Sequence, residues 1–485
     1  MRSLPIYETI YVIIVALVCL RIIYDTRSTT KTVAYMLLAI FVPIVGILVY
    51  FSFGINYRKR KIYNKKLVGD NNLEKKIQDA IVHYTLHNLE RKNPAIADNK
   101  ELARLLLKDG SSPLTANNQV QILVNGEQKF PEVLKALERA RYHIHIEYYI
   151  YEDDETGRAI EEVLIRKAKS GVEVRFIYDD FGSRSIRKKM VRRLRDAGVK
   201  VYPFYRILFI FLANRINYRN HRKIIVVDGK VGFVGGINVS NRYVNKPNEP
   251  NDLFWRDTHL RIEGPGVLYL QYLFLADWNF CADDHLEPDS ILFPKAHILS
   301  SKSDKLVQIA ASGPDSDRPT ILYSLLQAIF LAQEEILITT PYFIPGESIV
   351  EALIVAALSG LKVKLLVPGI SDSVFVNAAA RSYYSELLKS GVEIYRYQKG
   401  FVHAKTMVTD RKVAIVGTAN MDYRSFDLNF EVNAIVYDEA VATELTNIFY
   451  EDLKDAEQID PIRWEARPWY YELTEKTARL VAPML

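Results

Sequence analysis

The chain is poor in cysteine, which occurs only twice among its 485 residues. Cys19 lies in an apolar run near the N-terminus, and Cys281 lies far along the chain. Two such distant cysteines exclude a disulfide framework and a metal site built from thiolates. The sequence also lacks the Gly-x4-Gly-Lys-Ser/Thr loop that cradles nucleotide phosphates, since the Gly235-Gly236 pair is too short for one. We therefore expect no nucleotide cofactor.

A strong excess of charge of one sign is also missing. Lysine and arginine together number 63 against 58 aspartate and glutamate residues, which gives a formal net charge of +5. So small an excess, without a long basic stripe, does not indicate a nucleic-acid partner. A chain of this length exceeds one ordinary core, so we expect two similar domains and an appendage.

Two long apolar segments are present near the N-terminus, at residues 4–24 and 32–53. Each has the roughly 20 residues that a helix needs to cross a hydrocarbon core. Pro43 and Gly46 interrupt the second segment, but membrane helices tolerate both residue types. A signal peptide is the alternative for the first segment, although no small-x-small cleavage site follows it. We therefore expect a two-helix transmembrane hairpin with a basic flank in residues 1–60.

The charges around these segments favour one orientation of the hairpin. The connection between the two segments contains only two cations, Arg27 and Lys31, which lie beside Asp25. Cations are more frequent on the cytoplasmic side of membrane helices, where basic clusters also attract anionic headgroups. The pattern predicts a multi-pass membrane protein whose later domains are cytoplasmic. The cations that follow the second segment are Arg58, Lys59, Arg60, Lys61, Lys65 and Lys66.

The rest of the chain contains an internal repeat. A helical linker is expected first, over residues 61–118, because apolar residues recur there at near-helical spacing. The two halves that follow, residues 119–290 and 291–485, share a succession of strand, helix, strand and a second helix that ends in Gly-Val. Strands that alternate with helices of this length indicate a duplicated α/β domain with mostly parallel pairing.

A His-x-Lys-x4-Asp motif occurs once in each half, followed by a tail of small residues that ends in asparagine. Two chance copies with matching tails would be rare, roughly one in a thousand. Two imidazoles can divide the roles of nucleophile and proton donor, which one imidazole cannot easily combine in one step. The duplicated motif therefore indicates an active site. Its residues are His221, Lys223, Asp228 and Asn238 in the first half and His403, Lys405, Asp410 and Asn420 in the second.

These motifs resemble the phospholipase D superfamily, whose members join two of them around one site. Residues 219–224, 254–258, 341–345 and 424–431 are similar to segments of bacterial cardiolipin synthases, and the resemblance covers nearly the whole chain. It implies duplicated phospholipase D-like domains, which form two lobes with a shared active site. It also implies a cardiolipin synthase of the bacterial cell membrane, which transfers a phosphatidyl group between two phosphatidylglycerols and releases glycerol.

The resemblance also implies a cradle for the phosphodiester. Lys223 and Lys405 each lie two residues from their histidine, on the same face of a strand, and can neutralise the nonbridging oxygens. Asn238 and Asn420 can donate amide hydrogen bonds to the same oxygens. Because side chains supply the cations, we expect no metal ion.

The two histidines are expected to act in turn. His221 attacks phosphorus to form a phosphatidyl-histidine, and His403 protonates the leaving alkoxide and later deprotonates the acceptor. The near symmetry of the motifs leaves the reverse assignment open. Asp257 and Glu431, by resemblance, orient the imidazoles and favour the imidazolium form of one of them.

The motif aspartates, Asp228 and Asp410, are expected to act differently from the rest of the site. They belong to the family's motif, and we count them with the site for that reason. Each precedes a residue typical of a turn, Gly229 in the first half and Arg411 in the second. We therefore expect them to hold local backbone or ion pairs away from phosphorus.

Several functions remain open at this point. The intermediate can pass to water, as in a membrane-bound phospholipase D, or to another small alcohol, and some members of the superfamily cut nucleic acid. A lipid-binding scaffold without activity is disfavoured because both motifs are intact. Two membrane segments favour a lipid acceptor, since they hold the site where donor and acceptor are bilayer lipids. We expect phosphatidylglycerol, other anionic phospholipids and the bilayer as partners, and no nucleic acid; the sequence does not define the oligomeric state or the acyl-chain preference.

Two apolar features have alternative interpretations. The run at 207–212 is either a buried strand or an interfacial loop that dips into the bilayer beside the site. Near the C-terminus, Trp464, Trp469, Tyr470 and Tyr471 either favour the bilayer interface or pack against the second lobe.

Overall fold

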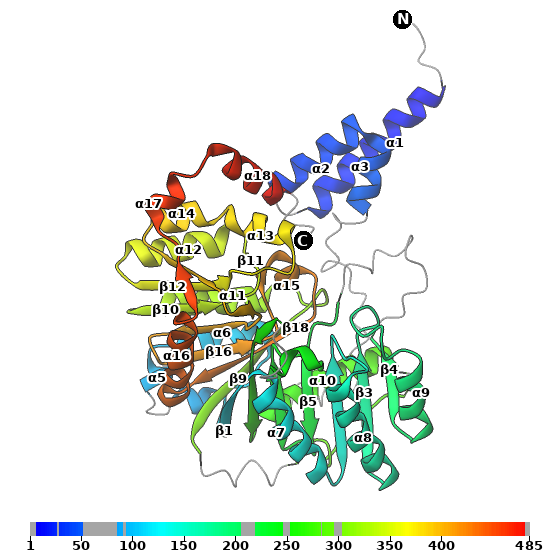
Figure 1. Cartoon of the computed structure of the whole chain (residues 1–485). Helices are drawn as coiled ribbons and strands as arrows, with labels where there is room; N and C mark the ends of the chain where they lie inside the picture. Colours follow the sequence, from blue (N-terminus) through cyan, green and yellow to red (C-terminus); the bar gives the residue numbers. More distant parts are fainter. Residues whose placement is uncertain are drawn as a thin grey trace, which may run out of the picture.

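The computed structural model of the chain describes residues 6–26, 29–51, 85–90, 94–204, 219–245, 253–282, 284–294 and 303–480. Its centre is one 15-stranded sheet to which both halves of the chain contribute (Figure 1). The first half provides β1 (Thr115–Val124), β2 (His143–Tyr148), β3 (Glu173–Tyr178), β4 (Lys200–Pro203), β5 (Lys223–Val227), β6 (Val231–Gly235) and β8 (Thr258–Glu263). The second provides β9 (Lys305–Ser312), β10 (Glu335–Thr339), β12 (Lys362–Pro368), β13 (Glu393–Tyr397), β15 (Thr406–Thr409), β16 (Val413–Gly417), β18 (Glu431–Tyr437) and β19 (Ala456–Gln458).

The strand order confirms the internal repeat. The first half runs β4-β3-β2-β5-β6-β8-β1, and the second runs β13-β12-β10-β15-β16-β18-β9 with β19 added at its edge. β1 and β9 pair with each other and so join the two halves into one sheet. The two domains therefore share a sheet instead of forming separate ones.

The expectation of mostly parallel pairing is wrong. Only β2-β3-β4 and β10-β12-β13 run parallel, and the other neighbours in the sheet are antiparallel. The reason lies in the histidine motifs, because the strand after each histidine turns back as a hairpin, β5–β6 in the first half and β15–β16 in the second. A hairpin of adjacent strands must be antiparallel, whereas the strand–helix–strand units before it are parallel.

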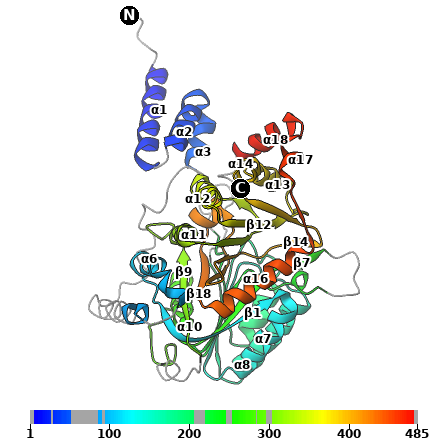
Figure 2. The ribbon, with the colours of Figure 1, turned by 90° about the vertical axis from the view of Figure 1, so that its left-hand side faces the viewer.

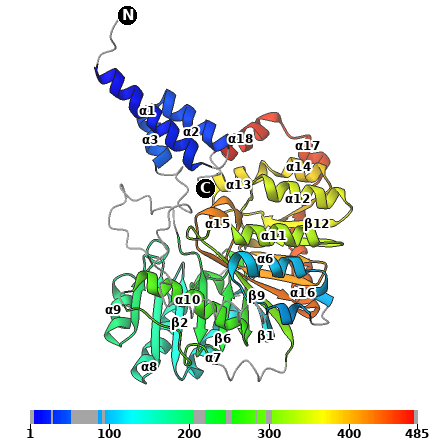
Figure 3. The same cartoon turned by 180° about the vertical axis from the view of Figure 1, so that it is seen from behind.

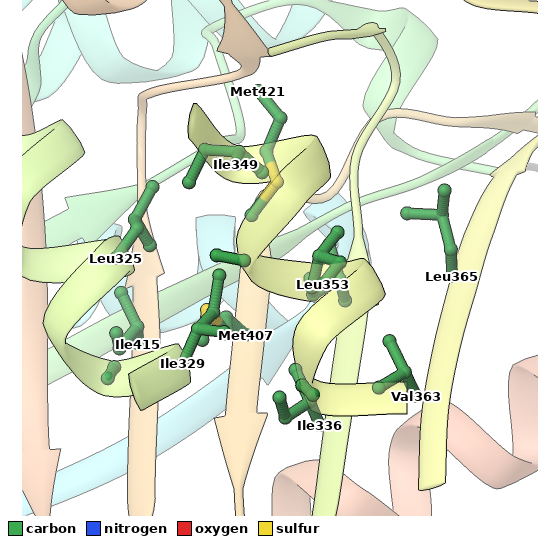
Figure 4. Packing of buried hydrophobic residues seen from close by; sticks show 14 of the residues in the cluster. Leu325, Ile329, Ile336, Ile349, Leu353, Val363, Leu365, Met407, Ile415 and Met421 are labelled. Carbon is green, nitrogen blue, oxygen red and sulfur yellow. The ribbon is translucent and has the colours of Figure 1, made fainter. Parts of the chain in front are cut away.

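Helices cover the faces of the sheet, which explains why β5, β16 and β18 are buried along their whole length. The first half has α7 (Asn125–Arg139), α8 (Glu155–Lys169), α9 (Lys189–Asp196) and α10 (Gly266–Cys281). The second has α11 (Thr320–Leu331), α12 (Glu347–Leu358), α13 (Val374–Arg381), α14 (Tyr384–Lys389), α15 (Tyr423–Asp427), α16 (Glu439–Leu453), α17 (Pro461–Glu465) and α18 (Trp469–Leu480). Figure 4 shows α11 and α12 packing Leu325 and Leu353 above Ile336 of β10.

The described part of the expected linker packs on the catalytic body. It includes α5 (Pro94–Ala97) and α6 (Lys100–Gly110), and Leu102, Ala103 and Leu106 of α6 are buried in the same core as α11. From behind, α6 lies between α11 and α10 (Figure 3). The remainder of the linker, residues 61–84 and 91–93, lies outside the described residues.

The N-terminal segment forms three helices instead of the expected two. α1 (Ile6–Asp25) matches the first apolar segment, but the second is split into α2 (Thr29–Phe41) and α3 (Pro43–Val49). The chain breaks at Pro43, and a Cβ on Gly46 would lie 2.4 Å from the backbone of Leu38, so α3 folds back closely onto α2. Within the described part of the chain, no helix combines the length and apolar character that a membrane crossing requires.

Candidate active site

A short cross-lobe strand pair positions His403. β14 (Gly400–Val402) of the second half runs parallel to β7 (Phe254–Arg256) of the first, with Val402 opposite Arg256. The backbone N–H of His403 then donates to the carbonyl of Arg256 at 2.7 Å. This register brings Asp257, the next residue of the first half, against the ring, and Nδ1 of His403 lies 2.7 Å from Oδ2 of Asp257.

The same arrangement is repeated around His221. Asn220 forms an isolated parallel bridge with Phe430, and the N–H of His221 donates to the carbonyl of Phe430 at 2.9 Å. Nδ1 of His221 consequently lies 2.9 Å from both carboxylate oxygens of Glu431. Each imidazole is therefore held at Nδ1 by a carboxylate from the opposite half.

Both carboxylates have further partners that fix them. Oδ1 of Asp257 accepts from the backbone N–H of Thr258 at 2.7 Å. For Glu431, the hydroxyl of Thr418 donates to Oε2 at 2.5 Å and the amide of Asn429 donates to Oε1 at 3.2 Å. Thr418 was not predicted as a site residue, although its place in the small-residue tail after the second motif could have identified it.

The electrostatic state of the two histidines differs from the expectation. Burial lowers the pKa of His221 to about 4, although Glu431 opposes this effect. Burial and the charge of Lys405 lower the pKa of His403 to about 3, against the opposing effect of Asp257. Both imidazoles are therefore neutral near pH 7, and the carboxylates orient them without holding either one as an imidazolium.

The two motif lysines are buried beside the histidines. Nζ of Lys223 donates to the carbonyl of His221 at 2.8 Å, and Nζ of Lys405 lies 2.9 and 3.0 Å from the two ring nitrogens of His403. Burial lowers the pKa of Lys223 to about 7 and that of Lys405 to about 8. An anion that enters the site would stabilise the charged form of both lysines.

The two asparagines of the small-residue tails are also buried. Nδ2 of Asn238 donates to the hydroxyl of Tyr243 at 2.8 Å, and Nδ2 of Asn420 donates to Oδ2 of Asp422 at 3.1 Å. Each amide group has a second hydrogen, so both residues can also donate to a substrate oxygen. Oδ1 of Asn420 is buried and has no hydrogen-bond partner among the residues that the structure describes.

The motif aspartates lie in turns away from the imidazoles. Asp228 has a φ of +52° and its carboxylate accepts from the backbone N–H groups of Arg141, Tyr142 and His143 at 2.8–2.9 Å. Asp410 has a φ of +53° and accepts in the same way from the N–H groups of residues 333–335 at 2.8–2.9 Å. Asp tolerates this left-handed conformation in hairpin turns better than most residues. Both aspartates therefore tie the hairpin of each motif to the strand beside it.

Aromatic rings surround the imidazoles. Tyr149 meets His221 edge to face with ring centroids 4.8 Å apart. Around His403, the ring centroids of Trp255, Phe401 and Tyr243 lie 5.6–5.9 Å away. Trp255 and Phe401 each lie two residues before a site residue, and the strand period of two could have identified them in the sequence. Such rings limit water around the imidazoles and strengthen the electrostatic interactions there.

Comparisons with known proteins agree with this geometry. A family model described as cardiolipin synthase, PLD-like domain, matches residues 133–261 and 325–453, and a phospholipase D-nuclease N-terminal model matches residues 10–54. A protein named cardiolipin synthase from Halalkalibacterium halodurans is 40% identical over 479 residues, which is 99% of this chain and 94% of that protein. The major cardiolipin synthase ClsA of Bacillus subtilis is 37% identical over 480 residues, 98% of each chain.

Among solved structures, a phosphatidylserine synthase from Haemophilus influenzae is similar in fold, with a TM-score of 0.58 at 14% identity, over 79% of this chain and 100% of that one. The fold and the paired motifs define a two-lobed phospholipase D-like protein. The chain belongs to the bacterial cardiolipin synthases of the phospholipase D superfamily.

Proposed function

We propose that this chain makes cardiolipin by transferring a phosphatidyl group from one phosphatidylglycerol to another, through a phosphatidyl-histidine, with release of glycerol. The observation that carries the proposal is the crossed arrangement of His221 with Glu431 and His403 with Asp257. It places two oriented imidazoles at one site to which both halves contribute, as a two-step displacement at phosphorus requires.

In the first step, Nε2 of His221 attacks phosphorus and the bond from phosphorus to the glycerol oxygen breaks. Lys223 and Lys405 neutralise the nonbridging oxygens, together with the amides of Asn238 and Asn420. The negative phosphodiester next to His403 raises the low pKa of that imidazole, so that it carries the proton that the leaving glycerol alkoxide takes.

In the second step, His403 removes the proton from the primary hydroxyl of a second phosphatidylglycerol. The hydroxyl oxygen attacks phosphorus, the bond from phosphorus to nitrogen breaks, and the electron pair returns to His221. One phosphodiester replaces another, so no nucleotide is needed. Hydrolysis to phosphatidic acid, the reaction of a membrane-bound phospholipase D, and transfer to another small alcohol are the alternative outcomes at this step.

The nucleophile can be identified with a phosphodiester that releases nitrophenolate, a leaving group that needs no protonation. In the His403→Asn variant we expect the intermediate to accumulate, because the group that activates the acceptor is gone. Mass spectrometry of the digested protein should then find the adduct on the peptide that contains His221. An adduct on His403 in the His221→Asn variant, with none on His221 in the converse variant, would reverse the assignment.

We propose further that the N-terminal segment attaches the body to the bilayer and leaves the catalytic lobes on the cytoplasmic face. Support comes from α1, on which Ile10, Leu17 and Leu20 are 52–63% exposed. The cations at 58–66 follow this segment in the sequence and favour that face of an anionic membrane.

The catalytic body also presents apolar side chains at the same end. Figures 1 and 2 show α13 and α18 at the end of the body from which α1–α3 project. At the start of α13, Val374 is 88% and Phe375 55% exposed, and Trp469 of α18 is 73% exposed. This end of the body is therefore suited to rest on the same lipid surface. The apolar run at 207–212, which the sequence also offers for this role, lies outside the described residues.

A further inference from the structure

The hydroxyl group of Tyr243 lies where the two halves of the site meet. Tyr243 ends the short 3₁₀ helix η4 (Asn241–Tyr243) of the first half, and only 2% of the residue is exposed. Nδ2 of Asn238 donates to the hydroxyl at 2.8 Å, and Nδ1 of His403, from the second half, lies 3.4 Å from it. One buried hydroxyl therefore contacts both an asparagine of the proposed phosphate cradle and a motif histidine of the opposite half.

Packing fixes the ring that carries this hydroxyl. The Tyr243 ring meets Trp255 edge to face with centroids 5.2 Å apart, and its centroid lies 5.9 Å from that of His403. A Cβ on Gly126 would lie 2.6 Å from the carbonyl oxygen of Tyr243, so the backbone there rests directly on the start of α7. Burial raises the pKa of Tyr243, and the charge of Asp257 raises it further, so the hydroxyl stays neutral near pH 7.

The hydroxyl determines the direction of the Asn238 amide. Oδ1 of Asn238 accepts from the backbone N–H of Ile150 at 3.3 Å, and one Nδ2 hydrogen is donated to Tyr243 at 2.8 Å. Because an amide group is planar, these two contacts also fix the direction of the second Nδ2 hydrogen, which can donate to a nonbridging oxygen. Without the hydroxyl, the longer contact to Ile150 would hold the amide alone.

The second half holds its own asparagine with a different residue. Nδ2 of Asn420 donates to Oδ2 of Asp422 at 3.1 Å, and Oδ1 of that carboxylate accepts from the N–H of Ser425 at 2.7 Å. Each cradle amide is thus held by one buried side chain, a carboxylate in the second half and a hydroxyl in the first. The repetition indicates that the site requires oriented amides, because donors fixed in advance stabilise transition-state charge without reorganising during the reaction.

We propose that Tyr243 is a positioning residue, which holds the Asn238 amide toward the phosphodiester beside His403. The inference rests on the proposed function, in which the Asn238 amide stabilises the nonbridging oxygens. It adds to the site a residue that lies outside both histidine motifs. If Tyr243 only positions Asn238, its hydroxyl should affect the chemical step through Asn238 alone.

The test is a double-mutant cycle on the first chemical step. Full-length protein in detergent micelles receives the phosphodiester that releases nitrophenolate, and the rate of the first turnover is measured at saturating substrate. Tyr243→Phe keeps the ring and removes the hydroxyl, so we expect this rate to fall about 10-fold with little change in the half-saturating concentration. Asn238→Ala should cost on the order of 10²-fold, the usual effect of losing one oriented donor. In the Asn238→Ala protein, Tyr243→Phe should cost less than about threefold more, because the group that it positions is gone.

The control is Tyr437→Phe, at the opposite end of β18 from Glu431. It removes another fully buried hydroxyl, which donates to Oε1 of Gln308 at 3.1 Å, and it should leave the rate unchanged. Effects of Tyr243→Phe and Asn238→Ala that multiply in the double variant would overturn the proposal, because the hydroxyl would then act independently of the amide.

A second readout separates positioning from stability. A lower apparent Tm of the Tyr243→Phe variant, with an unchanged rate per folded molecule, would overturn the proposal because the hydroxyl would then serve only the fold. Nitrophenolate release does not depend on the acceptor, so the cycle judges Tyr243 separately from the proposed function. Products without cardiolipin would overturn that function and leave the result of the cycle in place.

Discussion

His221 and Glu431 are 210 residues apart in the chain, yet Nδ1 of the imidazole lies 2.9 Å from both oxygens of the carboxylate. Asp257 and His403 repeat the contact in the opposite direction. The halves thus exchange their orienting carboxylates, and neither half contains a complete site. The crossing follows from two short parallel pairings that place the residues just before each carboxylate against those just before each histidine.

Removing either carboxylate charge should slow the reaction without unfolding the protein. For Glu431→Gln and Asp257→Asn we expect kcat to fall on the order of 10²- to 10⁴-fold, because the imidazole loses its orientation and the stabilisation of its charged form. The rate is measured by cardiolipin formation and the fold by the apparent Tm. A loss below threefold in either variant would show that its carboxylate does not serve the imidazole that it contacts.

The Asp228→Asn and Asp410→Asn variants should lose stability and keep most of their activity, the opposite of the two carboxylate variants above. Each change places an amide group among backbone N–H donors that now share a carboxylate, and the free energy of unfolding should fall by about 1–3 kcal/mol. Residual activity per folded molecule should stay well above that of the Glu431 and Asp257 variants. A large loss of kcat at an unchanged Tm would instead place these aspartates in the chemistry.

The buried lysines predict the alkaline side of the pH profile. The pKa of Lys223 is lowered to about 7 and that of Lys405 to about 8, so each loses its positive charge as the pH rises through its value. The value of kcat/KM, which reports the free enzyme, should therefore fall from about pH 7–8 upward. The fall in kcat should come at higher pH, because the bound phosphodiester stabilises both charges.

A variant of Lys223 tests this origin of the alkaline limb. Lys223→Arg keeps a charge that does not titrate in this range, so the lower of the two steps should disappear. The measurement is kcat/KM for phosphatidylglycerol between pH 6 and 10 in mixed micelles. A limb that stays unchanged in this variant, or one that begins only near pH 10, would contradict the role given to the buried lysines.

The exposed apolar residues at the start of α13 should be needed for activity on bilayers but not for activity on micelles. Replacing Val374 and Phe375 with serine removes two exposed apolar side chains, so vesicle binding and activity on vesicles should fall several-fold, while activity on short-chain micellar substrate stays. A matched control replaces Ile291 and Tyr142, which are also exposed. Equal behaviour of the two double variants on vesicles would show that the α13 end does not contact lipid.

The control pair lies at the far end of the first lobe. The N–H of Tyr142 donates to Asp228 at 2.8 Å, and a Cβ on Gly229 would lie 2.6 Å from the carbonyl of Leu292, the neighbour of Ile291. Both control residues therefore lie near the β5–β6 hairpin turn. This turn is about 20 Å from the end of β2 that lies near His221, at ~3.3 Å per residue of strand.

The sequence alone was sufficient to predict the internal repeat and to name the residues that meet at the site, because strand periodicity and motif spacing are local features. It did not say which imidazole each carboxylate contacts, since that depends on Val402 lying opposite Arg256 across the two halves. The antiparallel hairpins and the fold-back of α3 at Pro43 could not be predicted from local sequence patterns either. Tertiary packing decides the direction of a strand or helix after a turn.

In the proposed reaction, the phosphatidyl-histidine intermediate passes to a second lipid. The most direct measurement is mass spectrometry of the products that purified protein forms from phosphatidylglycerol alone, without nucleotide or added metal. Transfer to a second lipid should yield cardiolipin and free glycerol in equal amounts. Phosphatidic acid as the main product would show that water resolves the intermediate, and would contradict it.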